Sequence, residues 1–200
     1  MPETLISLIG GRLAIDFVNA GSRARPLSWE ELVVFLEATH VISKERSTLL
    51  LELPETDPQA AHGLLQRAAR FRASVRDILE AMLRRKEPRP DAIESINDLL
   101  QVTEGHDELR HDGERWRMEF VARESGLEWL LAAIARSAAE IVAEGITSSH
   151  VRVCANPGCG LFFYDASRTS RRRWCAMAVC GNRHKVASFA RKHAGERRAG

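Results

Sequence analysis

The sequence predicts a mainly α-helical body with one β-hairpin, followed by a small cysteine-rich module at the C-terminus. Three observations predict this class of fold. Apolar residues recur at helical spacing over most of the first 148 residues, one segment alternates instead with a period of two, and all four cysteines come after residue 153. A chain of 200 residues is long enough for one ordinary domain and a small module. We therefore expect two parts, residues 1–148 and residues 149–200.

The first part begins with an apolar segment, Gly11 to Ala20, that fits either a buried helix or a buried strand. After it, Ser28 is followed three residues later by Glu31 and then by an apolar stripe. This is the capping-box pattern, in which the serine and glutamate side chains accept hydrogen bonds from backbone amides at a helix start. It predicts a helix over about 29–41.

Further helices follow from capping residues and apolar spacing. Ser43 predicts the start of a short helix that ends at Pro54, because proline lacks the amide hydrogen that a helix needs. Residues 59–86 carry apolar side chains at steps of three and four and predict a long amphipathic helix. Asp91 predicts the cap of the next helix, and the spacing over 127–146 predicts another.

One segment between these helices has the period of a strand. Trp116, Met118 and Phe120 alternate with charged or smaller residues just after the turn-forming sequence His-Asp-Gly-Glu. We therefore expect one β-hairpin between about residues 109 and 122. Trp116 and Phe120, together with Trp129 of the following helix, are expected in the core rather than in an aromatic cage.

The two parts of the chain differ in charge. Residues 1–150 have a net charge of −7, whereas residues 151–200 carry 11 Lys and Arg against only Asp165 and Glu196, a net charge of +9. Such an excess attracts polyanions over about 8 Å at physiological salt, while the acidic body does not. Because we find neither a long apolar run nor the pattern of a secretory signal, we expect a soluble, cytoplasmic protein that does not bind membranes.

The four cysteines form two close pairs, Cys154 with Cys159 and Cys175 with Cys180. Each pair can wrap one edge of a tetrahedral ion, and four thiolates form the closed, structural type of zinc site. A module of about fifty residues has too little core to fold unaided, whereas zinc can contribute about 10–16 kcal/mol to such a fold. The spacing therefore predicts bound Zn²⁺; the alternatives are two disulfides or four buried thiols without metal.

The neighbouring residues predict how each pair is held. Pro157, Gly158 and Gly160 fit a tight turn between strand-like segments, so the first pair is expected on a β-hairpin knuckle. Cys180 is expected at a helix start, with Asn182 as a cap. A knuckle and a helix-start pair together make the treble-clef arrangement.

Basic and polar residues surround the second cysteine pair, and we predict that they bind nucleic acid. A helix start with basic side chains favours phosphate, and arginine can donate two parallel hydrogen bonds to it. Polar residues of the same helix could read base edges in a major groove. The predicted set is Arg168, Arg171, Arg172, Arg173, Asn182, Arg183, His184, Lys185, Arg191 and Lys192. The alternative is a solvated charged surface.

At this point the sequence resembles a known family. Residues 171–183, RRRWCAMAVCGNR, resemble the CGNR zinc-finger family, and residues 11–19, GRLAIDFVN, resemble the opening of the ABATE domain that precedes this finger. The resemblance covers nearly the whole chain and implies a stress-induced bacterial transcription regulator with zinc held by the four cysteines. DNA binding is inferred for the family from the same positive charge, so it adds no independent support. The run Val186 to Ala190 departs from the more arginine-rich members.

Three polar residues in the apolar first segment are candidates for ligand binding. Arg12, Asp16 and Asn19 could line a pocket for an effector, or a dimer contact, that controls the finger. Alternatively, Arg12 and Asp16 are four residues apart and pair with each other, while Asn19 caps the segment.

The sequence therefore predicts a transcription regulator that binds double-stranded DNA and responds to an unknown small-molecule effector; a homodimer is left open. A second hypothesis is a protein-interaction module, in which Phe162, Phe163, Trp174 and Phe189 form an apolar patch and the arginines only solubilise it. A third is RNA binding. We do not expect an enzyme, because the sequence has no nucleophile motif, phosphate-binding loop or paired-carboxylate signature.

Overall fold

A computed structural model describes residues 8–21, 26–101, 105–111, 113–122, 126–145 and 150–196. Residues 8–145 form a body with helices α1 (Leu13–Asn19), α2 (Trp29–Ala38), α3 (Lys44–Thr56), α4 (Pro58–Leu83), α5 (Pro90–Gln101) and α6 (Trp129–Ala143), and a hairpin of β1 (Gly105–His111) and β2 (Trp116–Ala122). Residues 150–196, which we call the finger, contain the antiparallel strands β3 (Val151–Val153) and β4 (Phe162–Tyr164), a π-helical turn η1 (Met177–Gly181) and α7 (Asn182–Glu196). The predicted fold class is confirmed.

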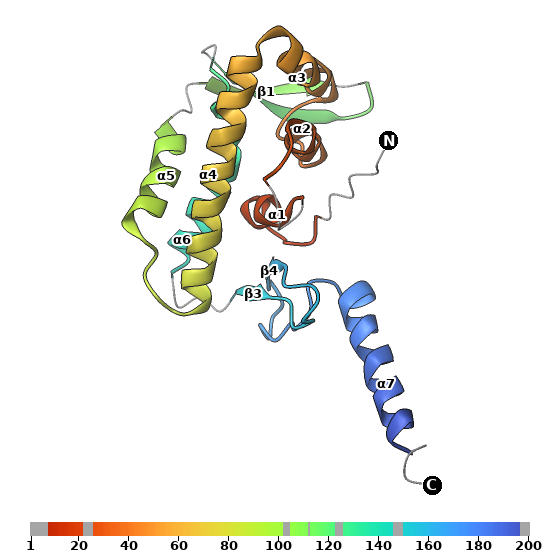
Figure 1. Cartoon of the computed structure of the whole chain (residues 1–200). Helices are drawn as coiled ribbons and strands as arrows, with labels where there is room; N and C mark the ends of the chain where they lie inside the picture. Colours follow the sequence, from red (N-terminus) through yellow and green to blue (C-terminus); the bar gives the residue numbers. More distant parts are fainter. Residues whose placement is uncertain are drawn as a thin grey trace.

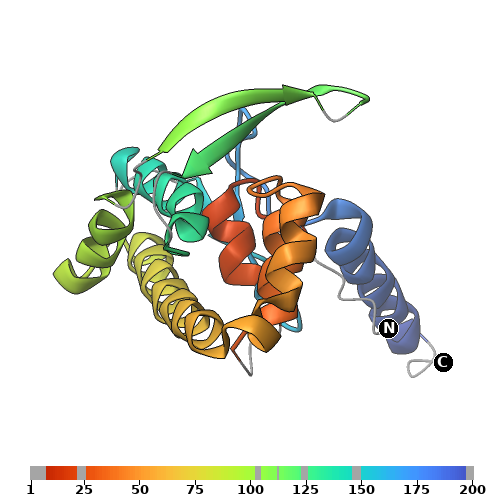
Figure 2. The ribbon, with the colours of Figure 1, turned by 90° about the horizontal axis from the view of Figure 1, so that it is seen from above.

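Helix α1 lies at the centre of the body, between α4, α6 and the α2–α3 pair (Figures 1 and 2). Its side chains Ala14, Ile15, Phe17 and Val18 have no exposed area. The ring of Phe17 lies 5.6 Å from that of Phe35 and 6.1 Å from that of Phe71, centroid to centroid. A helix that is buried on nearly every side shows no clear amphipathic period, so its sequence did not distinguish helix from strand.

The capping box at the start of α2 is confirmed, because the Ser28 side chain accepts the Glu31 amide and Glu31 accepts the Ser28 amide. The predicted end of the next helix at Pro54 is wrong, since α3 continues to Thr56. A proline leaves the carbonyl four residues before it without its helical amide partner. Here that carbonyl belongs to Leu50, and it accepts the indole N–H of Trp29 at 2.7 Å instead.

Asp91 does not cap α5 as predicted. The helix begins one residue earlier, at Pro90, and Asp91 lies in its first turn, where its carboxylate binds the guanidinium of Arg89. Proline is favoured at the first helical position because the amide hydrogen it lacks has no partner there.

The hairpin is confirmed, but its aromatic face is not core. Leu109 pairs with Met118 and His111 with Trp116, so these side chains share one face of the two-stranded sheet. Leu109, Trp116 and Met118 are 65%, 68% and 68% exposed. The expectation that Trp116 is buried is therefore wrong, whereas Trp129 is buried as expected. The side chain of Phe120 lies outside the described residues. Alternation identifies which residues share a face, but not whether another element covers it.

Asp16 is a buried carboxylate in α1, and its burial raises its pKa to about 6, although the Gly10 and Ile9 amides donate to it. The folded state therefore favours the protonated form of Asp16. The stabilisation that this form gives is fully present below pH 3.8, the ordinary pKa of the group, and is lost as pH rises through the folded pKa of about 6. At pH 7 the ionised carboxylate costs about 3 kcal/mol, at about 1.4 kcal/mol for each pKa unit.

We expect Asp16→Asn, which keeps an acceptor for the Gly10 amide, to stabilise the protein against urea at pH 7.5 by up to about 3 kcal/mol and very little at pH 4. Urea unfolding at both pH values measures this difference. Asp98→Asn, at an exposed position of α5, is the matched control and should change stability little at either pH. Equal effects of Asp16→Asn at both pH values would contradict the prediction.

Candidate metal centre and nucleic-acid interface

The structure brings the four predicted cysteines together. Their Sγ atoms all lie within 4.8 Å of one another, and Cys175 Sγ lies 3.6 Å from Cys159 Sγ and 3.7 Å from Cys180 Sγ. A disulfide needs about 2.05 Å, whereas four sulfurs about 2.3 Å from a tetrahedral ion lie about 3.8 Å apart. All four cysteines are free. The spacing therefore fits four ligands around one metal ion and excludes disulfides between them.

Backbone geometry around the first pair turns amides toward the sulfurs. The Cys154 amide donates to the Leu161 carbonyl at 2.8 Å, which closes the β3–β4 knuckle. The Asn156 amide donates to the sulfur of Cys154, and the Leu161 amide to that of Cys159. The side-chain amide of Asn156 also lies 3.5 Å from Cys180 Sγ and so connects the two pairs. Sequence reasoning did not identify Asn156, because this contact depends on the folded knuckle.

The electrostatics of the four thiols favour a cation. Burial, followed by the neighbouring cysteines, raises the pKa of the Cys175 thiol well above its ordinary value. Four thiolates so close together would repel one another unless a positive ion lay between them. The donor set is four soft thiolates with no carboxylate, which suits a soft or borderline dication.

The second pair is held differently from the prediction. Cys180 lies in η1, the π-helical turn that continues into α7, and its amide donates to the Ala176 carbonyl at 2.9 Å. Asn182 does not cap the helix, because its backbone is already helical and its side-chain amide donates to the Ala178 carbonyl at 3.0 Å. Asn182 therefore lies inside a continuous helical segment.

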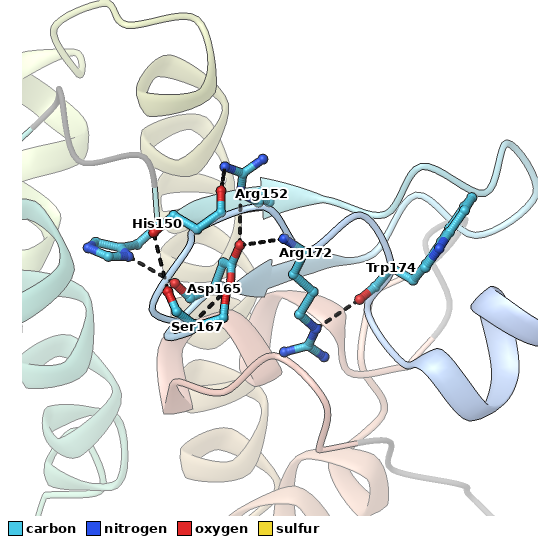
Figure 3. Close-up of polar contacts among 7 residues, drawn as sticks. His150, Arg152, Asp165, Ser167, Arg172 and Trp174 are labelled. Atoms are coloured by element: carbon cyan, nitrogen blue, oxygen red, sulfur yellow. Dashed lines mark hydrogen bonds and ion pairs between the residues drawn. The ribbon is translucent and has the colours of Figure 1, made fainter.

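A buried carboxylate organises the loop before the second pair (Figure 3). Asp165 has no exposed area and accepts hydrogen bonds from the Ser167 hydroxyl at 2.6 Å and the Arg172 amide at 2.8 Å. Its other partner is Arg152 of β3, whose Nε lies 3.2 Å away. Burial acts to raise the pKa of Asp165, but these donors outweigh it and hold the pKa below its ordinary value. The only signal in the sequence is that Asp165 is one of two acidic residues in a segment of charge +9.

The predicted nucleic-acid residues fall into two groups. Some side chains bind inside the finger: Arg172 donates to the carbonyls of Trp174 and Cys175 and lies over the Phe163 ring, and the His184 ring lies 4.8 Å from that of Trp174. Arg173 lies over the Trp174 ring at 5.0 Å. Arg172, Arg173 and His184 are nevertheless exposed, as are Arg168, Arg171, Arg183 and Lys185. The side chains of Arg191 and Lys192 lie outside the described residues.

Two family models match the chain. Residues 11–145 match ABATE, described as "Putative stress-induced transcription regulator". The chain belongs to the ABATE family. Residues 150–193 match the CGNR zinc finger, so the resemblance found in the sequence is confirmed in both parts. No curated protein matches the chain. Within the described residues, none of the helices is long and apolar enough to cross a membrane.

Arg12, just before α1, and Asn19, at its end, contact the CGNR finger. Arg12 binds Glu144 at 3.1 Å and lies over the Tyr164 ring of β4. Asn19 donates to the Phe162 carbonyl at 2.8 Å and accepts the Phe162 amide at 3.0 Å. The expected Arg12–Asp16 pair and the cap by Asn19 are therefore wrong. A ligand-binding role of Arg12, Asp16 and Asn19 stays a prediction, but each already has a partner within the chain.

Gly10, just before α1, makes a further contact between the ABATE domain and the CGNR finger. The Gly10 carbonyl accepts the Tyr164 amide at 2.6 Å, while its own amide donates to Asp16. A Cβ at Gly10 would lie only 2.8 Å from the Asp16 carboxylate and 2.6 Å from Ile15 Cγ2, so this close approach needs glycine. Phe162 and Tyr164 belong to the same apolar core as α1. The CGNR finger is therefore packed onto the ABATE domain rather than tethered to it.

The apolar patch expected for a protein-interaction module does not form as predicted. Phe162, Phe163 and Trp174 are buried, and of the four aromatic residues only Phe189 is exposed, at 66%. The other large apolar residues of the finger that are exposed do not belong to the predicted patch: Val153, Met177, Val179 and Val186.

Proposed function

We propose that this protein is a transcription regulator whose CGNR finger holds Zn²⁺ in the four-cysteine site and binds the phosphates of double-stranded DNA. Zinc is supported by the four sulfurs at tetrahedral spacing, since four-thiolate tetrahedral sites are typical of structural zinc. The site offers no open ligand position, which favours a structural role for the ion.

One observation carries the DNA-binding proposal. Arg168, Arg171, Arg183 and Lys185 are exposed around a scaffold that the metal site and Asp165 hold in place. The segment that contains them has a net charge of +9. Phosphate contacts by such side chains supply most of the non-specific affinity for DNA and make it depend on salt. The acidic ABATE domain, by contrast, repels the same polyanion.

Effector sensing belongs to the ABATE domain in this proposal. A cavity of about 280 Å³ lies between the hairpin and the corner that joins α2 to α3. Its lining combines apolar and basic side chains, as small-molecule sites commonly do: His40, Ile42, Ser43, Arg115, Trp116, Arg117 and Met118. We place the effector here rather than at Arg12, Asp16 and Asn19, whose side chains hold the junction with the finger.

We expect the double variant Arg168→Gln, Arg171→Gln to bind a 30-base-pair duplex at least about tenfold more weakly than wild type in 0.1 M salt. The slope of log affinity against log salt should fall by about two, because two side chains no longer neutralise a phosphate. Fluorescence anisotropy across a salt series measures both quantities, and zinc content measured on the same samples should be unchanged. Arg172 is left intact, because its guanidinium holds the backbone of Trp174 and Cys175.

The matched control is Arg70→Gln, Arg136→Gln, which removes the same charge from exposed positions of α4 and α6. It should leave both the affinity and the salt slope close to wild type. An unchanged slope in the finger variant, or the absence of any salt-dependent duplex binding by wild type, would contradict the proposal. Tighter binding of a structured RNA than of the duplex would assign the finger to RNA instead.

A further inference from the structure

Helix α7, the last element of the finger, points away from the ABATE domain (Figure 1). The contact between Trp174 and His184 fixes which side of this helix faces the rest of the finger. Because a helix turns by about 100° per residue, Asn182, Val186 and Phe189 lie on the opposite side. Val179 of η1 joins them, since it lines one shallow surface depression together with Asn182 and Val186. We call these four residues the outer strip.

The outer strip is mostly apolar and open to solvent. Val186 is 70% exposed, Phe189 66% and Val179 49%. By the same helical geometry, Arg183 lies on one flank of the strip and Lys185 on the other, and both are exposed. The residues that line the depression include no acidic side chain. An apolar strip with a basic side chain on each flank is unusual for a solvated surface and indicates a partner.

The charges decide which partner fits. A second copy of α7 would bring Arg183 and Lys185 against identical cations, which disfavours pairing of this strip with itself. The major groove of duplex DNA offers the complementary surface, because thymine methyl groups lie on its floor and a row of phosphates lies on either side. The groove is about 12 Å wide and admits an α-helix.

We propose that α7 lies in the DNA major groove, with Val179 and Val186 against thymine methyl groups and with Arg183 and Lys185 toward the phosphates of the two strands. This inference rests on the proposed function and adds a preference for A·T base pairs to it. His184 faces Trp174 and Asn182 is bonded to the Ala178 carbonyl, so the valines are the specificity-determining residues here. In this proposal apolar contacts take the place of the base-edge contacts that the sequence predicted for polar residues of this helix.

The test removes the methyl group from the DNA rather than from the protein. A duplex is first selected from a random pool with the full-length, zinc-loaded chain and is then synthesised with deoxyuridine in place of thymidine. Uracil keeps every hydrogen-bonding group of thymine and lacks only the methyl. We expect wild type to bind the uracil duplex more weakly, by about fourfold for each methyl group that it buries.

Val186→Ala should bind the thymine duplex more weakly than wild type does and should discriminate less between the two duplexes. Val34→Ala, at an exposed position of α2, is the matched control and should discriminate as wild type does. Equal affinity of wild type for the thymine and uracil duplexes, with salt-dependent binding retained, would overturn this inference and leave the proposed function standing. If the wild-type chain bound neither duplex, the proposed function would fail as well. The wild-type comparison needs no variant to fold.

Discussion

Replacing Cys180 with serine is expected to abolish tight metal binding and to unfold the CGNR finger. Cys180 is buried and contributes one of four sulfurs at the spacing of a tetrahedral site. The apolar cluster around that site is small: besides the cysteines it contains buried Phe163 and Trp174, with Ile9 and Leu161 partly buried against them. Such a cluster cannot offset the conformational entropy of the finger, whereas zinc binding contributes about 10–16 kcal/mol in isolated fingers.

The consequence should extend into the ABATE domain. Val151, Phe162 and Tyr164 of the finger strands belong to the core that includes α1. Unfolding of the finger therefore uncovers part of that core, and we expect the thermal midpoint of the remaining helical transition to fall by several degrees. An effect confined to the finger would show that the junction contributes little to the stability of the body.

Zinc content, limited proteolysis and circular dichroism of the full chain measure these changes. The matched control is Ala178→Ser, which introduces the same hydroxyl at an exposed position of the same π-helical turn. It should retain one zinc ion per chain and wild-type resistance to protease. If the Cys180→Ser protein bound zinc as tightly as wild type and kept the finger protected, the four-thiolate site would not be what holds the finger together.

The features that the sequence predicted correctly depend on neighbours close in the chain. The capping box of Ser28 and Glu31 needs only four residues, and the turn within each cysteine pair needs only six. The spacing of the two pairs also indicates that they meet, because a shared ion is a common reason for such spacing. Local chemistry therefore defined both the metal site and most of the helix starts.

The features that it missed depend on residues far apart in the chain. Pro54 stays within α3 because Trp29, 25 positions earlier, occupies the carbonyl of Leu50. Arg12 binds Glu144 rather than Asp16. Asn19 binds the backbone of Phe162 rather than capping its own helix. No periodicity or spacing rule encodes these pairings, since the first exists only once α1 packs beside the end of α6 and the second only once α1 packs against β4.

The sequence also could not show which apolar residues are exposed and which are buried. Trp116 and Val186 carry the same apolar signal as buried residues, but the first lies on an uncovered hairpin face and the second on the outer side of α7. Periodicity identifies a face, and only the arrangement of the other elements shows whether that face is buried. This distinction matters for function, because the uncovered faces are those that can meet a partner.

Asp165→Asn is expected to loosen the arginine-bearing loop of the finger without removing its metal ligands. The carboxylate accepts the Ser167 hydroxyl and the Arg172 amide and forms an ion pair with Arg152. Hydrogen bonds to a charged group are worth about 1.5–3 kcal/mol each, and removing the anion also leaves Arg152 without its buried partner. We expect the finger to lose about 3 kcal/mol of stability toward local opening.

Hydrogen exchange at the Arg172 amide measures this change directly, because that amide donates to the carboxylate. It should exchange about 100-fold faster in the variant, since about 1.4 kcal/mol corresponds to a factor of ten. Ser167→Ala removes one neutral donor and keeps the anion, so it should accelerate exchange about tenfold at most. Equal effects of the two substitutions would mean that the charge of Asp165 contributes nothing beyond one hydrogen bond.

The pH dependence gives an independent check of the same idea. Because the folded state holds the pKa of Asp165 below its ordinary value, the stabilisation is present above that value and is lost as pH falls through the folded pKa. Wild type and Asp165→Asn should therefore differ in finger stability at neutral pH, and the difference should shrink as pH falls toward the folded pKa, over the range in which the metal stays bound. At neutral pH Asp165→Asn should also bind DNA more weakly than wild type, because the loop that Asp165 holds is the one that presents Arg168 and Arg171. A variant with wild-type protection and wild-type DNA affinity would show that the loop is held by the metal alone.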